Sequence, residues 1–128
     1  MKVIASAPHF FVSDIHTSVR FYVDVLGFDE PDLWGDPPAF AMPRKDGFVV
    51  MLNQADTMPP SPNGPRNCWD AYFWVDRELD GFSRRLLEAG ADIAYGPEVQ
   101  PAYGMKELAV RDPDGYMLVF AEDIDPQS

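Results

Sequence analysis

The sequence is poor in cysteine and has no long apolar run. Its one cysteine, Cys68, excludes an internal disulfide framework and is typical of a reducing compartment. Every apolar stretch is far shorter than the roughly 20 residues needed to cross a bilayer. The N-terminal segment also lacks the apolar core of a secretory signal peptide. We therefore expect a cytoplasmic protein that is not embedded in a membrane.

Basic residues are scarce as well. The chain has 10 Lys and Arg against 21 Asp and Glu, which gives a formal net charge of −11. A field of that sign repels the phosphate backbone of nucleic acids and anionic membrane surfaces, and it attracts cationic small molecules. Nucleic-acid and membrane partners are therefore not expected, whereas a small-molecule ligand is compatible with the charge.

The residues that are abundant are apolar and aromatic. Of the 128 residues, 46% are hydrophobic and 13% are aromatic. A chain of this length buries roughly two-thirds of its unfolded surface. We expect a single domain, residues 1–128, with a core of its own.

The sequence repeats a pattern. Residues 8–28 and 71–92 each read as an apolar run ending in Val, followed by Asp and by a helical pattern closed by Gly. Residues 46–52 (DGFVVML) correspond in the same way to residues 114–120 (DGYMLVF). The offsets are 63 residues for the first pair (Val12 to Val75) and 68 for the second (Gly47 to Gly115). One copy alone would be too small for a comfortable core, so the two copies are expected to pack together.

Each copy predicts a βαβββ module. Apolar residues at helical spacing predict helices over residues 15–26 and 78–89, with Gly27 and Gly90 as their stops. Further strands are predicted at 30–34, 38–43, 48–53, 92–95, 105–111 and 116–122. The α+β domain thus consists of module 1 (about 5–53), a Pro-rich linker (about 54–68) and module 2 (about 69–122).

Two motifs carry a family resemblance. The early FYVDVLGF and the late YGMKELAVRDPDGYMLVF, within paired βαβββ modules, resemble the vicinal oxygen chelate superfamily. That superfamily includes glyoxalase I, extradiol dioxygenases, fosfomycin-resistance enzymes and bleomycin-resistance proteins. The resemblance implies two modules whose sheets form a half-open barrel around a cavity, usually in a homodimer.

The metal positions of that superfamily are mostly without donors here. Enzymes of the superfamily hold a divalent metal with His, Glu or Gln at four strand positions, which correspond to Ala7, Met51, Asp70 and Val119. A metal needs several N or O donors converging on one point. We therefore expect no metal and no other cofactor, and the chain resembles most the metal-free, bleomycin-resistance-like branch.

His9 leaves a second interpretation open. Strand alternation places His9 on the cavity-facing side, where Asp70 is also expected. Such a pair could bind a metal weakly or act as an acid–base couple. The alternative is a histidine that is simply hydrogen-bonded in the cavity wall.

Aromatic residues are the main candidates for ligand contact. Flat aromatic walls next to a carboxylate suit a planar or cationic guest, although large aromatics also fill small barrels as core. Glu107 is a candidate cavity carboxylate or else a surface residue. The predicted ligand-binding residues are His9, Trp34, Phe40, Met51, Asp70, Tyr72, Trp74, Tyr103 and Glu107.

Three functions remain in view. The first is a metal-free protein that sequesters an aromatic or cationic compound, as bleomycin-resistance proteins do, with no catalytic residues. The second is a glyoxalase- or dioxygenase-like enzyme with a non-standard metal or acid–base site around His9, Asp70 and Glu107. The third is a structural or regulatory partner whose cavity is filled by its own side chains.

Overall fold

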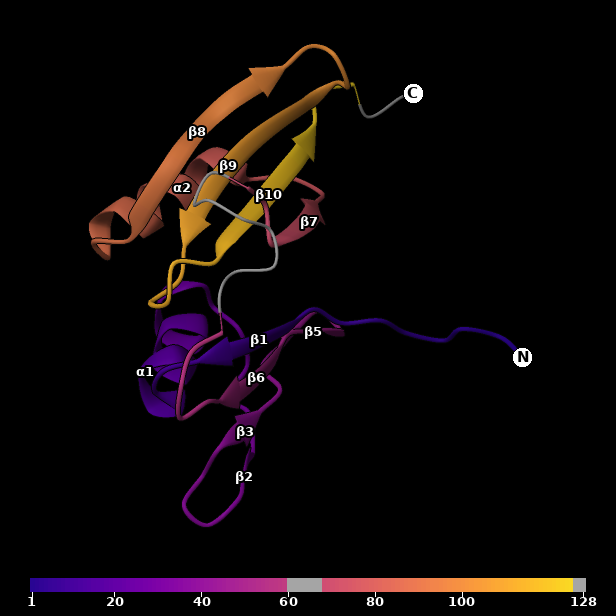
Figure 1. Ribbon diagram of the computed structural model, residues 1–128. Coiled ribbons are helices and arrows are strands. Elements are labelled where there is room, and N and C mark those ends of the chain that lie inside the picture. The colour runs from indigo at the N-terminus through magenta and orange to yellow at the C-terminus, as the bar shows by residue number, and fades with distance from the viewer. Residues whose placement is uncertain (60–67, 126–128) are drawn as a thin grey trace. The chain divides into compact units, whose positions relative to one another are not determined.

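The chain divides into two compact units, residues 1–61 and 62–128. The computed structural model describes residues 1–59 and 68–125. The boundary falls inside the predicted linker 54–68, of which residues 60–67 lie outside the described part. Strands and helices occur in both units, so the protein has the expected mixed α+β character (Figure 1). None of the helices described is long and apolar enough to span a membrane.

The first unit is built on short strands. It begins with β1 (His9–Val12), α1 (Ile15–Arg20) and the π-helical turn η1 (Phe21–Val25). Its other strands are β2 (Leu33–Trp34), β3 (Phe40–Ala41), β4 (Arg44–Lys45), β5 (Phe48–Val49) and β6 (Met51–Gln54). One sheet has the order β1-β6-β3-β2, with β1 parallel to β6, and β4 pairs separately with β5.

The predicted helix over residues 15–26 is confirmed in extent. It starts after Asp14 because the Asp14 carboxylate accepts hydrogen bonds from the backbone N–H groups of His16 (3.0 Å) and Thr17 (3.2 Å). Residues 21–25 take the wider π geometry, in which Tyr22 is fully buried. Gly27 ends the segment with a φ of 83°, a conformation that glycine adopts without strain.

The strands of the first unit are shorter than predicted. The stretches predicted at 30–34 and 38–43 contribute only the two-residue strands β2 and β3 to the main sheet. The stretch 48–53 is divided between β5 and β6. Prolines at positions 31, 37, 38 and 43 lack the N–H that a sheet ladder needs, and this limits the pairing.

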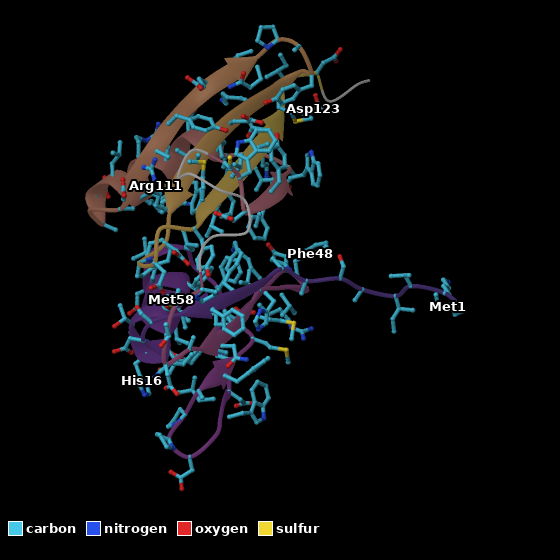
Figure 2. All side chains as sticks on the ribbon, viewed as in Figure 1. Met1, His16, Phe48, Met58, Arg111 and Asp123 are labelled. Carbon is cyan, nitrogen blue, oxygen red and sulfur yellow. The ribbon has the colours of Figure 1, made fainter. Side chains whose placement is uncertain are left out.

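The second unit has a more regular sheet. Its elements are β7 (Ala71–Val75), α2 (Leu79–Glu88), β8 (Asp92–Gln100), β9 (Met105–Arg111) and β10 (Met117–Asp123). The sheet order is β7-β10-β9-β8, with β7 parallel to β10 and the other pairs antiparallel. Arg111 and Asp123, labelled in Figure 2, mark the two ends of this sheet.

One face of the second sheet packs against α2. The Phe73 ring stacks on Phe120 with centroids 5.0 Å apart, and Phe82 of α2 meets Phe120 edge-on at 4.9 Å. Leu79 and Leu86 of α2 are buried. Phe73 therefore faces the helix, and Tyr72 and Trp74 are left on the opposite face.

Both units tie the start of their helix to their last strand. In the first unit the backbone N–H of Ile15 donates to Oε1 of Gln54 at 2.9 Å. In the second the N–H of Leu79 donates to Oε1 of Glu122 at 3.3 Å. Gln54 and Glu122 are 68 residues apart, the same offset that relates the two DG-containing segments of the repeat. The repeat therefore extends to this side-chain contact.

Strand β8 departs most from its prediction. A strand was predicted at residues 92–95, but β8 continues through Gly96 and Pro97 to Gln100. The register shifts twice along it, between Ile93 and Tyr95 and between Tyr95 and Glu98. The Gly-Pro pair is therefore a bulge inside a longer strand rather than its end.

Candidate functional site

A buried carboxylate lies at the centre of the second sheet. Glu107, in β9, is 0% exposed. Tyr72 (2.6 Å) and Tyr103 (2.8 Å) donate hydrogen bonds to its Oε2, and Tyr95 donates to Oε1 at 2.8 Å. Three hydroxyl donors on one carboxyl group match the ionised form, which can only accept. These bonds offset the large cost of burying a charge.

The sheet register brings these groups together. Tyr72 of β7 lies opposite Val119 of β10, and across β10 and β9 the same row continues through Ala109 to Tyr95 of β8. Glu107 is two residues from Ala109 and therefore faces the same way. Val119 and Ala109 are fully buried, and both tyrosines pack against them. The small side chains in the middle strands thus form a floor for the rings.

Tyr95 reaches this face because β8 is irregular. Simple alternation would point Ile93 and Tyr95 in the same direction, but the two pair with consecutive residues of β9. The register shift between Ile93 and Tyr95 therefore turns Tyr95 toward Glu107. Trp69, just before β7, donates its indole N–H to the Tyr95 hydroxyl at 3.0 Å. Neither Tyr95 nor Trp69 was among the predicted site residues.

Aromatic rings surround the carboxylate. The Tyr72 ring lies between Trp69 and Trp74, with centroid distances of 5.0 and 4.9 Å. Trp74 is 73% exposed, Tyr103 49% and Trp69 45%, so these rings are far more open than core aromatics. We call this surface the aromatic face, consisting of Trp69, Tyr72, Trp74, Tyr95, Tyr103 and Glu107.

The carboxylate and the tyrosines affect one another electrostatically. Desolvation by burial raises the pKa of Tyr72, Tyr95 and Tyr103 above the ordinary tyrosine value. The hydrogen bond and the charge of Glu107 raise these pKa values further, because a phenolate would repel the carboxylate. The hydroxyls therefore keep their protons near neutral pH and remain donors to Glu107.

Asp70 is held by the backbone of the neighbouring strand. Its Oδ2 accepts a hydrogen bond from the N–H of Met117 at 2.8 Å, and its own N–H donates to the Met117 carbonyl at 2.9 Å. These bonds close the ladder between β7 and β10 at its first rung. The described contacts of Asp70 are thus structural, and its role in ligand binding stays a prediction.

The remaining predicted residues belong to the first unit. His9 lies opposite Met51, and its ring meets Phe11 edge-on at 4.9 Å. Trp34 pairs with Phe40 at a centroid distance of 5.7 Å. By register and alternation these side chains share one face of the first sheet. Their contact with a ligand, and the proposed pairing of His9 with an acid of the second unit, stay predictions.

The metal that this fold carries in some enzymes does not fit the side chains here. Ala7 and Val119 have no donor atom, Met51 offers only a thioether, and Asp70 is engaged with Met117. Catalytic sites need several hard donors on one metal ion. Within residues 1–59 and 68–125, no group of three or more His, Cys, Asp or Glu side chains is arranged to hold a metal ion.

Sequence comparison identifies the family. Residues 4–120 match the family model described as the Glyoxalase/Bleomycin resistance protein/Dioxygenase superfamily. The chain belongs to this superfamily. The resemblance inferred from the two motifs is therefore confirmed, and the fold of the chain is that of the superfamily.

Two relatives of this chain carry names that indicate different roles. The chain is 32% identical over 109 residues to the metallothiol transferase FosB of Shouchella clausii (strain KSM-K16), covering 85% of the chain and 73% of that protein. It is 28% identical over 114 residues to the virulence protein STM3117 of Salmonella typhimurium, covering 87% and 78%. These relatives support membership without deciding between binding and catalysis.

Solved structures share the fold. TnmS3, an antibiotic binding protein from Streptomyces sp. CB03234, superimposes with a TM-score of 0.72 at 23% identity. The match covers 95% of this chain and 97% of TnmS3. At this identity the similarity shows the fold alone.

Proposed function

We propose that this protein binds a planar aromatic or cationic small molecule on the aromatic face and holds it without chemical change. The observation that carries the proposal is a buried carboxylate, Glu107, beneath tryptophan and tyrosine rings that stay open to solvent. Each stacking or cation–π contact contributes about 0.5–2 kcal/mol. Several such rings can therefore give useful affinity without covalent chemistry.

The charge of the chain supports the cationic part of this proposal. The net charge of −11 raises the local concentration of cations around the protein. Of the side chains at the superfamily's metal positions only Asp70 has a hard donor, which favours binding over metal-assisted chemistry in this chain. TnmS3 offers a precedent, because a protein of this fold is described as antibiotic binding.

We further propose that the protein acts as a homodimer in the cytoplasm. The superfamily resemblance implies a dimer, and the single cysteine fits a reducing compartment. Sedimentation equilibrium tests the oligomeric state directly. A mass of one chain across the concentration range would contradict the dimer and leave the binding proposal intact.

Calorimetric titration tests the binding proposal. We expect bleomycin or a planar aromatic cation to bind dialysed, metal-depleted protein with about one ligand per subunit. Trp74→Ala should weaken that binding about tenfold, because it removes the most open ring of the aromatic face. If none of these ligands binds, or if the Trp74→Ala protein binds as tightly as the parent, the proposal is wrong.

Phe48→Ala is the matched control. Phe48, labelled in Figure 2, is also an exposed aromatic at 70% but lies in β5 of the first unit, outside the aromatic face. Its removal should leave binding within about twofold of the parent. Equal losses in both variants would indicate non-specific contact with exposed rings.

The alternative is an enzyme with a non-standard site around His9, Asp70 and Glu107. Similarity to FosB, a protein named as a transferase, is the observation that favours it. Against it, Glu107 accepts three tyrosine hydroxyls and Asp70 accepts a backbone N–H. Stoichiometric metal in the purified protein, lost in His9→Ala, would favour the enzyme over the binding protein.

A further inference from the structure

The hydrogens of the tyrosine hydroxyls around Glu107 have a fixed direction. An ionised carboxylate has no hydrogen to give, so each of the tyrosines Tyr72, Tyr95 and Tyr103 must point its O–H at Glu107. The raised pKa values keep these protons in place. A hydroxyl has only one hydrogen, so none is left for a second donation.

What remains on each hydroxyl oxygen is the capacity to accept. The Tyr95 oxygen already accepts the indole N–H of Trp69. In the part of the chain that the structure describes, no donor is directed at the hydroxyl oxygens of Tyr72 and Tyr103. Tyr103 is 49% exposed, and Tyr72 lies between the open rings of Trp69 and Trp74.

We propose that the aromatic face is selective for ligands that carry an ammonium, amidinium or guanidinium group with N–H donors, because Glu107 holds the hydroxyls of Tyr72 and Tyr103 as acceptors. This inference rests on the proposed function and specifies its ligand class. Because the hydroxyls of Tyr72 and Tyr103 point their hydrogens at Glu107, carbonyl, carboxylate and phosphate groups are disfavoured at this position. Those groups bring lone pairs toward oxygens that have no hydrogen to offer, and toward a buried negative charge.

Stacking on the rings alone predicts a different selectivity. Cation–π attraction is also strong for quaternary ammonium groups, which aromatic cages bind without any N–H. An acceptor site requires hydrogens on the cation. A primary ammonium and its trimethylated form, attached to the same ring, therefore separate the two modes of recognition.

The test uses a set of naphthalene probes with matched rings. The probes are naphthylmethylammonium, its N,N,N-trimethyl form and methyl naphthyl ketone, each titrated calorimetrically near neutral pH. We expect the primary ammonium to bind about tenfold tighter than the trimethylated cation, the effect of one hydrogen bond to a charged donor. Equal affinities, or tighter binding of the trimethylated cation, would overturn the inference.

Glu107→Leu should remove the fixed direction of the hydroxyls. Leucine accepts no hydrogen bond, so the hydroxyls of Tyr72 and Tyr103, which both donate to Oε2 of Glu107, become free to donate outward. We expect the tenfold preference to fall below about twofold and the ketone to bind more tightly than it binds the parent. An unchanged preference in a folded Glu107→Leu protein would contradict the inference.

Tyr103→Phe provides a variant that keeps the buried carboxylate and its donors Tyr72 and Tyr95. It keeps the half-exposed ring and removes only a hydroxyl outside the strands. The primary ammonium should lose about threefold or more in affinity, whereas the trimethylated cation should be unaffected. Equal losses for both probes would assign Tyr103 to stacking alone and overturn its role as an acceptor.

Failure of this inference differs from failure of the proposed function. If no aromatic probe, with or without charge, binds the parent protein, the binding function itself is wrong. If the probes bind but show no preference for N–H donors, the aromatic face binds ligands by stacking and only the selectivity is wrong.

Discussion

The two units follow one chain order, but their open faces present different chemistry. In the first unit the face carries an imidazole, a thioether, a phenyl ring and an indole, from His9, Met51, Phe40 and Trp34. In the second unit the corresponding face carries phenols and an indole N–H around the carboxylate of Glu107. A connected hydrogen-bond network is thus present in one copy of the repeat.

The features that both units share are those that hold the fold. Gln54 and Glu122 receive the first helical N–H of their units, and Gly27 (φ 83°) and Gly90 (φ 75°) follow the two helices. The strands differ, since β8 has nine residues and β2 has two. Both copies of the repeat therefore keep the side-chain contact at the start of the helix and the glycine after it. The longer strands of the second sheet carry the hydrogen-bond network around Glu107.

The largest expected effect concerns a glycine beneath the aromatic face. An added side-chain carbon at Gly96 (φ 88°) would overlap the backbone carbonyl oxygen of Glu107, which must then move. We expect Gly96→Ala to lower the free energy of unfolding by about 3 kcal/mol or more. Urea denaturation followed by circular dichroism measures the change.

Gly47→Ala in the first unit is the control for that substitution. Gly47 also has a positive φ, 86°, but a side-chain carbon there would meet nothing within 4 Å. The cost should be only the backbone strain, about 1–2 kcal/mol. Similar losses in the two variants would mean that the close approach of β8 to β9 is unimportant for stability.

The next effect is alkaline unfolding. The folded-state pKa values of Tyr72 and Tyr95 are raised above the ordinary tyrosine value of 10.0. Below pH 10 both tyrosines are protonated in the folded and the unfolded chain, so their contribution to the free energy of unfolding is complete there. Above pH 10 the tyrosines of the unfolded chain lose their protons before those of the folded chain. The free energy of unfolding therefore falls by up to about 1.4 kcal/mol per pH unit for each tyrosine. Chemical denaturation at pH values around and above 10 measures the slope.

A double variant tests whether these tyrosines cause the slope. Tyr72→Phe with Tyr95→Phe should flatten the decline above pH 10, although the protein will be less stable at neutral pH because Glu107 loses two donors. If the parent and the double variant lose stability in parallel, other groups are responsible.

The smallest effects concern the helix anchors that the units share. Gln54→Ala removes the acceptor of the Ile15 N–H and should cost about 1 kcal/mol. Glu122→Gln keeps an acceptor for the Leu79 N–H and loses only the attraction to Lys106, 3.5 Å away, so it should cost less than about 0.5 kcal/mol. A larger loss at Glu122 than at Gln54 would show that charge, not helix anchoring, dominates there.

Much of the fold could be predicted because its signals are local. The glycine stops and the apolar spacing of both helices lie within a few residues of one another, and the sequence repeat revealed the two modules. The short strands of the first unit were overestimated, because an apolar pattern does not reveal which residues find a partner. The length of β8 was underestimated because Gly-Pro is also a signal for a turn.

The site could be predicted only in part. Tyr72, Trp74, Tyr103 and Glu107 were candidates from alternation and motif position, and the structure places all of them on one face. Tyr95 was missed, since alternation from Ile93 assigns it to the helix side. The register shift between Ile93 and Tyr95 that reverses this assignment has no signal in the local sequence pattern.

The sequence by itself determined the family, the charge, the repeat and the absence of donor atoms at most of the superfamily's metal positions, because each depends on residue identity and short spacing. The tertiary structure alone decided that Tyr95 faces Glu107, that Trp69 joins the network and that Asp70 is engaged with the backbone. Those outcomes depend on the register between strands. One bulge in β8 changes the side of the sheet to which a residue points, and local periodicity cannot anticipate it.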